Sequence, residues 1–305
     1  MTLELYFQKI GTESTPLKYG DLAQLSGLTD SDVSSMERLW ASVPVERRRM
    51  LIERLLTMAE NNIDLDFTSV FKHSLSDEDP MVRALGVNGL WESNDRKLVM
   101  PLIALLQEDS HKDVRASAAV ALGKFGALAQ DGKLLSRDGE RIKEMLLNSL
   151  EEPDEDPDVW RRVLEAAAVF NTPRVRELIG NAYASEESKL RISAIFAMGK
   201  TADAAWLPTL IKAVGDDDPA IRYESAIALG ELAEEKAVPH LIPLINDHDT
   251  QVQLASIKSM GAIGGQLATR ALQKCLNSDD DSIREAAEVA LSDLGVEDDP
   301  MGFGL

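Results

Sequence analysis

Few side chains in this 305-residue sequence are of the types that carry out catalysis or hold a metal. The four histidines (His73, His111, His240 and His248) are scattered, and there is one cysteine. Cys275 lies between Leu272 and Leu276 on a segment with helical apolar spacing, which predicts a small core residue rather than a nucleophile. The sequence has no Gly-x-Ser-x-Gly elbow, no glycine-rich phosphate loop and no cysteine pair. We therefore expect a protein that is not an enzyme and that uses no cofactor and no metal.

Asp and Glu are the most abundant ionisable side chains, and many of them form short clusters along the chain. The clusters are Asp77-Glu78-Asp79, Glu151-Glu152 with Asp154-Glu155-Asp156, Glu186-Glu187, Asp216-Asp217-Asp218, Asp247 with Asp249, and Asp279-Asp280-Asp281. Each precedes a predicted helix, where carboxylates cap free N–H groups and face the positive end of the helix dipole. A surface for a basic partner or for divalent cations is the alternative, although no cluster has the spacing of a calcium loop.

The charge balance limits the classes of partner that this protein is expected to bind. Lys and Arg total 32 against 52 for Asp and Glu, a formal net charge of −20, which repels nucleic acid and anionic lipid. We expect no nucleic-acid partner and no membrane association, since the longest apolar run, Leu98 to Leu106, is too short to span a bilayer. A single cysteine and an N-terminus without signal-peptide features predict a cytoplasmic protein.

A repeat of 31 residues positions the acidic clusters. Earlier copies have their apolar anchors at Val82 and Val114, and the longer step that follows implies an insertion at about residues 127–140. The later anchors follow one another at intervals of 31 residues: Val159, Leu190, Ile221, Val252 and Ile283.

Each copy is predicted to be a pair of helices. Apolar or small residues stand four and eight positions after the anchor, which is helical spacing, and a second apolar run such as 237–245 separates the copies. An Asp-Pro pair, as at Asp218-Pro219, suits an N-cap followed by proline in the first turn. Glycines at the far end are predicted to stop the helices: Gly123, Gly199, Gly230 and Gly261.

Such a pair buries its apolar face only against its neighbours, so we expect an all-α fold, an α-solenoid of about seven helix pairs in residues 64–295. Residues 1–63 lack the period and are interpreted as a helical N-terminal cap, with a separate functional domain as the alternative. Turn signals at Asp131-Gly132 and Asp138-Gly139 predict that the insertion protrudes as a loop. Residues 296–305 are expected to be an acidic, flexible tail.

The recurring pattern Asp-Pro-x-(Val/Ile)-Arg-x-x-Ala-Ala-x-Ala-Leu-Gly resembles HEAT-repeat proteins of the short bacterial kind, the group that includes the bilin-lyase-like repeats. Iron-dependent hydroxylases with this fold use His-Glu dipeptides, and no histidine here is followed by Glu. The resemblance implies a structural ladder in which the repeat arginines bind turn aspartates of neighbouring repeats, with gaps at Trp160 and Gln253. The arginines are Arg83, Arg115, Arg191, Arg222 and Arg284.

The second helix of each pair exposes a face opposite its buried stripe, at positions two and six after the anchor. Polar residues such as Asn88 and Glu285 occur there near the ends of the array. In the central repeats the same positions hold apolar residues: Ile192, Phe196, Tyr223, Ile227 and Leu254. An apolar strip within a polar rim is typical of a protein-binding groove, here on the concave side of the solenoid, although tight curvature that buries these side chains between helices is the alternative.

The sequence therefore predicts a scaffold or adaptor that binds a protein or an extended peptide in its concave groove, with a preference for basic segments. The alternative is an accessory subunit of a lyase-type or other modifying enzyme, as the resemblance to bilin lyases implies.

Overall fold

The computed structural model describes residues 3–12, 16–152 and 155–298, and these form helices and turns with no strand. The expected all-α solenoid architecture is thereby confirmed. The chain divides into two compact units, Met1–Val163 and Leu164–Leu305. Among the described residues, no helix combines the length and the apolar character that crossing a bilayer requires.

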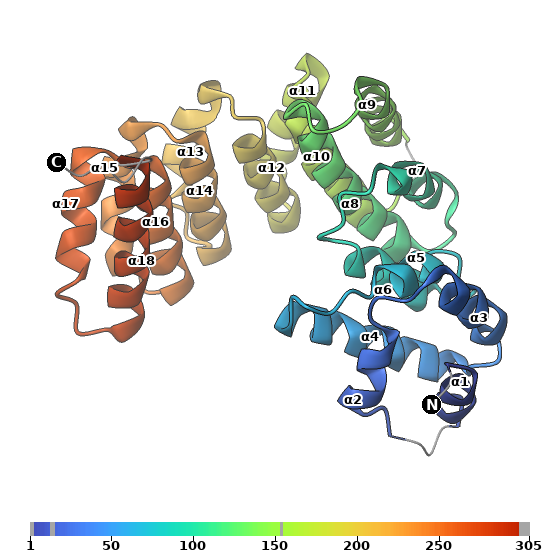
Figure 1. The fold of residues 1–305 in the computed structure, drawn as a ribbon. Coiled ribbons are helices and arrows are strands. Elements are labelled where there is room, and N and C mark those ends of the chain that lie inside the picture. The colour runs from blue at the N-terminus through green and yellow to red at the C-terminus, as the bar shows by residue number, and fades with distance from the viewer. Residues whose placement is uncertain (1–2, 13–15, 153–154, 299–305) are drawn as a thin grey trace. The chain divides into compact units, whose positions relative to one another are not determined.

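The first unit begins with the N-terminal region and continues into the repeats, shown from blue to green in Figure 1. Helix α4 packs on α6, and α6 packs on α8, so the second helices of successive pairs form a row. The helices are α1 (Leu3–Ile10), α2 (Tyr19–Leu22), α3 (Asp30–Trp40), α4 (Val45–Asn61), α5 (Thr68–Ser74), α6 (Pro80–Gly89), α7 (Val99–Glu108), α8 (Lys112–Gln130), α9 (Ser136–Leu150) and the start of α10 (Pro157–Ala167).

The second unit has the same construction, and its second helices lie side by side in Figure 1. Its helices are α11 (Pro173–Tyr183), α12 (Ser188–Lys200), α13 (Leu207–Ala213), α14 (Pro219–Leu232), α15 (Val238–Leu241), α16 (Thr250–Ile263), α17 (Gly265–Cys275) and α18 (Asp281–Asp298). Both units also contain short 3-10 helices: η1 (Ala23–Leu25), η2 (Arg96–Leu98), η3 (Ala168–Phe170), η4 (Ala204–Trp206), η5 (Glu235–Ala237) and η6 (Ile242–Asn246).

The repeat anchors form the core. Leu190 is half-buried, and the other six anchors are at most 5% exposed: Val82, Val114, Val159, Ile221, Val252 and Ile283. The Asp-Pro starts behave as predicted, because Asp79 and Asp218 each accept a backbone N–H from the first turn of the helix that they cap.

The glycines that were expected to stop the helices have a different role, and that prediction was wrong. Gly199, Gly230 and Gly261 lie inside their helices with negative φ, where the next helix approaches closely. A Cβ at Gly230 would lie 2.8 Å from Ser259 Cβ, and one at Gly261 would lie 2.8 Å from Ala290 Cβ. The fourth, Gly123, also lies inside its helix, α8. Gly199, Gly230 and Gly261 therefore allow neighbouring helices to pack at short range rather than ending their own helices.

The insertion does not form the expected protruding loop. Helices α8 and α9 extend into it, so that only residues 131–135 lie between them. Asp138 and Gly139, interpreted as a turn, are buried in the first turn of α9, and Asp138 forms an ion pair with Arg96 at 3.1 Å. Similarly, α18 continues to Asp298 at the start of the predicted tail, and the remainder of the tail, 299–305, lies outside the described residues.

Candidate functional site

The repeat arginines form a ladder along the turns that precede the second helices. Arg83 binds Asp109 with two bonds of 2.6 and 2.8 Å, and Arg222 binds Asp247 with two bonds of 2.7 Å. Arg115 binds Glu155 in the same bidentate way, at 2.7 and 3.2 Å. In each case the carboxylate belongs to the turn of the following pair. Charge-assisted, bidentate bonds of this kind join one repeat to the next.

The ladder aspartates also shape their own turns. Asp109 and Asp247 each accept the backbone N–H two residues later, at 2.9 Å. Asp216 does the same at 3.1 Å and takes a 2.5 Å bond from Arg191. The bond from Arg222 holds the pKa of Asp247 below its usual value, and these carboxylates are therefore ionised at neutral pH.

The ladder is interrupted where the sequence lacks arginine. Gln253 keeps one element of the motif, donating to the carbonyl of Asp247 at 2.6 Å just as Arg222 donates to that of Asp216 at 3.0 Å. Trp160 donates instead to the carbonyl of Leu150, and it lies on α10, the helix at which the two units divide. Arg284 binds the carbonyl of Ser278 and the side chain of Asp281 on its own helix.

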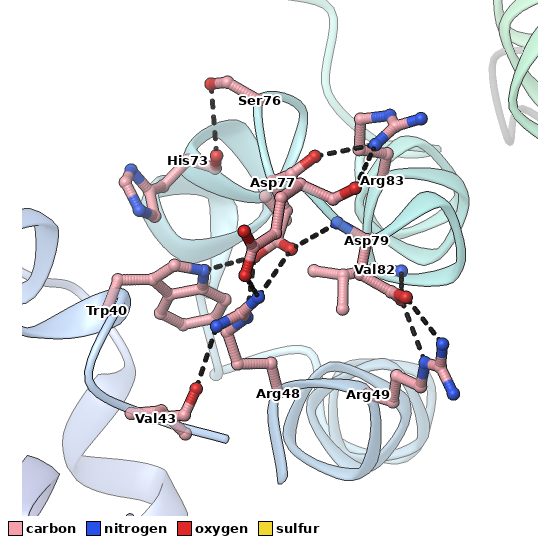
Figure 2. Close-up of polar contacts among 12 residues, drawn as sticks. Trp40, Val43, Arg48, Arg49, His73, Ser76, Asp77, Asp79, Val82 and Arg83 are labelled. Atoms are coloured by element: carbon pink, nitrogen blue, oxygen red, sulfur yellow. Dashed lines mark hydrogen bonds and ion pairs between the residues drawn. The ribbon is translucent and has the colours of Figure 1, made fainter. Parts of the chain in front are cut away.

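Sequence reasoning missed the first rung, which lies in residues 1–63. Arg49 of α4 binds Asp79 through Nε at 2.9 Å and Nη2 at 2.5 Å. Beside it, Arg48 Nε lies 2.9 Å from Asp77 Oδ2, and the two side chains are only 3% and 1% exposed. Figure 2 shows that the Trp40 indole donates to the same carboxylate, at 2.5 Å. The consecutive arginines were the available signal, but no apolar anchor stands beside them.

Some side chains of the acidic clusters therefore have a structural role. Asp77, Asp79 and Asp247 serve the ladder and the helix caps, whereas Glu78, Asp217 and Asp279 are exposed. The side chain of Glu78 is 78% exposed even though it accepts a bond from Arg48. Asp154 of the second cluster lies outside the described residues. Within the described ranges, no three His, Cys, Asp or Glu side chains are grouped so that they could hold a metal ion.

The five predicted groove residues lie on three neighbouring helices of the second unit. Ile192 and Phe196 come from α12, Tyr223 and Ile227 from α14, and Leu254 from α16. Tyr223 is 37% exposed, and the other four are half-buried. The adjacent positions on the same helices, Ile195, Ala226 and Ala255, are buried, so the five form the outward-facing surface of a well-packed layer. We call these five residues the apolar face.

The apolar face is bordered by charges and continues into a groove. Lys200 Nζ lies 5.1 Å from the centre of the Phe196 ring and pairs with Glu231 of α14. Beyond Leu254, a groove of about 720 Å³ runs between α16 and α18. Its walls include Ala262, Ala286 and Val289, and Val289 is 57% exposed. Sequence reasoning did not select Val289, since it treated the last repeat as a polar end.

Solved structures with this architecture come from different functional settings. The complex of CpcE and CpcF of phycocyanin lyase from Nostoc sp. PCC7120 matches with a TM-score of 0.55 and 16% identity, covering 93% of this chain and 99% of that one. Yeast importin-beta, Kap95p, matches with a TM-score of 0.53 and 16% identity, covering 96% of this chain and 46% of that one. At these identities the similarity establishes the fold.

No curated protein sequence matches the chain. The family model for HEAT repeats matches residues 68–137, 178–251 and 207–292, ranges that include the helix pairs joined by Arg83, Arg191 and Arg222. Because these matches together span more than half of the sequence, the chain belongs to the HEAT-repeat family.

Proposed function

We propose that this protein is a non-enzymatic scaffold of the cytoplasm that binds another protein, or an extended peptide, across the apolar face of α12, α14 and α16. The observation that carries the proposal is that these side chains lie together on the outward side of one layer of helices. Tyr223 is 37% exposed, and Phe196 and Leu254 are half-buried. The core beneath them is filled by other side chains, among them Ile195 and Ala226, which are fully buried. Aromatic side chains in such positions are the usual anchors of protein interfaces.

The charge distribution favours a basic partner. The edge at which these helices begin carries exposed carboxylates, among them Glu186, Glu187 and Asp217, in a chain of formal net charge −20. A field of this sign attracts basic segments and speeds their encounter, with an effect that weakens as salt rises. A partner with apolar anchors flanked by Lys or Arg would match both the apolar face and its border.

A second candidate is an accessory subunit of a lyase-type modifying enzyme. The observation in its favour is the fold similarity to CpcE and CpcF, which form a complex in phycocyanin lyase. In this case the partner would be a second subunit of the enzyme rather than a free adaptor target. The apolar face serves either function, and the identity of the bound protein separates the two.

A photo-crosslinking residue tests the proposal. Benzoyl-phenylalanine in place of Tyr223 is expected to capture a defined protein in lysate of the source cell, with capture reduced by added salt. The same residue in place of Lys212, which is exposed on α13 of the first-helix row, serves as the control. Equal adducts from both positions, or none from Tyr223, would count against binding at the apolar face.

A further inference from the structure

The junction between α16 and α18 lacks both halves of a ladder rung. Gln253 stands where Arg222 stands one repeat earlier, and Ser278 stands where Asp247 stands, 31 residues before it. Ser278 keeps the turn geometry, because its hydroxyl accepts the N–H of Asp280 at 3.2 Å, as Asp247 accepts that of Asp249. The bidentate ion pair that fills the preceding junction is therefore replaced by two shorter, uncharged side chains.

A cavity of about 660 Å³ opens at this junction, and Gln253 and Ser278 are part of its lining. That volume suits one large side chain together with its adjoining peptide. Much of the remaining wall is apolar, formed by Ile242, Ile245, Leu267, Ala271 and Ile283. Leu267, Ala271 and Cys275 are spaced four residues apart, so one stripe of α17 faces the cavity.

Two cations stand at the same cavity. Arg270 and Lys274 are exposed on α17, one turn apart. In the part of the chain that the structure describes, neither forms an ion pair, although carboxylates outnumber cations by 52 to 32. Arg270 donates only to the carbonyl of Gln266 on its own helix, at 3.2 Å. The one carboxylate in the lining, Asp280, is engaged as a cap that accepts the N–H of Ser282 at 2.8 Å.

We infer that this cavity is a second binding site, which takes an acidic peptide segment by burying one bulky apolar side chain against α17 while Arg270 and Lys274 bind the flanking carboxylates. The site shares no residue with the apolar face and prefers the opposite charge. The charged residues of the lining are two cations and one carboxylate, and screening over about 8 Å at physiological salt weakens the field of carboxylates farther away.

The single cysteine provides a reporter for this site. Cys275 lines the cavity and is 5% exposed, and burial raises the pKa of its thiol, so its modification by N-ethylmaleimide at mildly alkaline pH is slow and sensitive to access. A capped peptide Glu-Glu-Phe-Glu-Glu is expected to slow this modification at least about fivefold at saturation. The matched peptide Lys-Lys-Phe-Lys-Lys is expected to leave the rate unchanged.

Two variants of the full chain sharpen the test. Arg270→Gln with Lys274→Gln should weaken acidic-peptide binding about tenfold, measured as the ratio of the modification rates with and without peptide in the same variant. Its matched control is Lys236→Gln with Lys258→Gln, which removes the same charge outside the cavity lining. Gln253→Arg with Ser278→Asp should place an ion pair in the cavity and reduce the protection by the acidic peptide, with a thermal midpoint at least equal to that of the parent.

The inference is overturned if both peptides protect Cys275 equally, if neither protects it, or if the Arg270/Lys274 variant is protected as well as its control. These outcomes are independent of the apolar face, since Tyr223 and Phe196 are unchanged in every protein tested.

Discussion

The second helices of the second unit use their polar edge and their apolar face in different ways. At the edge, Arg222 and Asp247 each bond to side chain and backbone, and their side chains are 16% and 8% exposed. On the face, Tyr223 is 37% exposed, and within the described ranges no hydrogen bond or ion pair joins it to a neighbouring helix. The charged residues are thus committed to structure, and the apolar ones remain available. Edge variants should lose stability, and face variants should lose binding.

The largest loss of stability is expected from the buried end of the ladder in the first unit. Asp77→Ala would leave the buried Arg48 guanidinium with only the exposed carboxylate of Glu78 and remove the acceptor of the Trp40 indole. The free energy of unfolding should fall by about 3–5 kcal/mol. Urea denaturation measures this. Glu78→Ala is the control, because that side chain is 78% exposed, and an equally large loss there would contradict the assignment.

A smaller loss is expected at a partly exposed rung. Arg222→Gln reproduces the residue that nature has at Gln253, so the bond to the Asp216 carbonyl can persist while the ion pair with Asp247 is lost. We expect the free energy of unfolding to fall by about 1.5–3 kcal/mol. Arg284→Gln, whose arginine pairs only within its own helix among the described residues, should cost less. Similar losses for the two variants would mean that the ion pair between repeats, Arg222 with Asp247, adds no more stability than a pair within one helix.

The ladder also predicts a direction for the effect of acid. Bonds from Arg49 and Arg222 lower the pKa of Asp79 and of Asp247 from the ordinary value of 3.8. The lowered values mean that this stability is fully present above about pH 4 and is lost as the pH falls through the lower folded-state pKa values. Denaturation at pH 7 and pH 3 should reveal a smaller acid effect in Arg222→Gln than in the parent. An equal loss of stability in acid for the two proteins would mean that this rung does not contribute to the acid effect.

The stacked layer of helix pairs could be predicted from the sequence, because an apolar anchor every 31 residues can be buried only between stacked helices. The sequence also predicted that Tyr223 and Leu254 face outward, since 100° per residue is a property of the helix itself, and in the structure Tyr223 is 37% exposed and Leu254 is half-buried. By contrast, Gly230 was misinterpreted because a short approach to Ser259 depends on the neighbouring helix. The turn predicted at Asp138 and Gly139 failed because a helix extension could absorb the extra residues.

Two further features could be recognised only in the three-dimensional structure. Arg48 replaces an apolar anchor with a buried charge, which is stable only because Asp77 arrives from 29 residues away. The cavity beside Cys275 is lined by Gln253 and Ser278, which stand where the preceding rung has Arg222 and Asp247, and each of these differences appears minor in the sequence.

The smallest expected effect is a gain in stability that touches neither the edge nor the face. Ala233 ends α14 with φ of 52°, a left-handed conformation that costs a residue with a Cβ about 1–2 kcal/mol. Ala233→Gly should raise the free energy of unfolding by about 0.5–1 kcal/mol once the greater freedom of unfolded glycine is deducted. Ala127→Gly, inside α8 with negative φ, should lower it by about 1 kcal/mol. A loss at both positions would contradict this account.

The most direct test of the central claim, that the apolar face is free for a partner, is the pair Phe196→Ser and Tyr223→Ser in one protein. We expect the melting curve to indicate a loss below about 2 kcal/mol, since both side chains are partly exposed, while the partner captured through position 223 no longer binds. Leu229→Ala, at a fully buried position, should cost about 2–5 kcal/mol and calibrates the measurement. A loss of about 3–5 kcal/mol for each aromatic residue, or undiminished binding by a folded variant, would contradict the account.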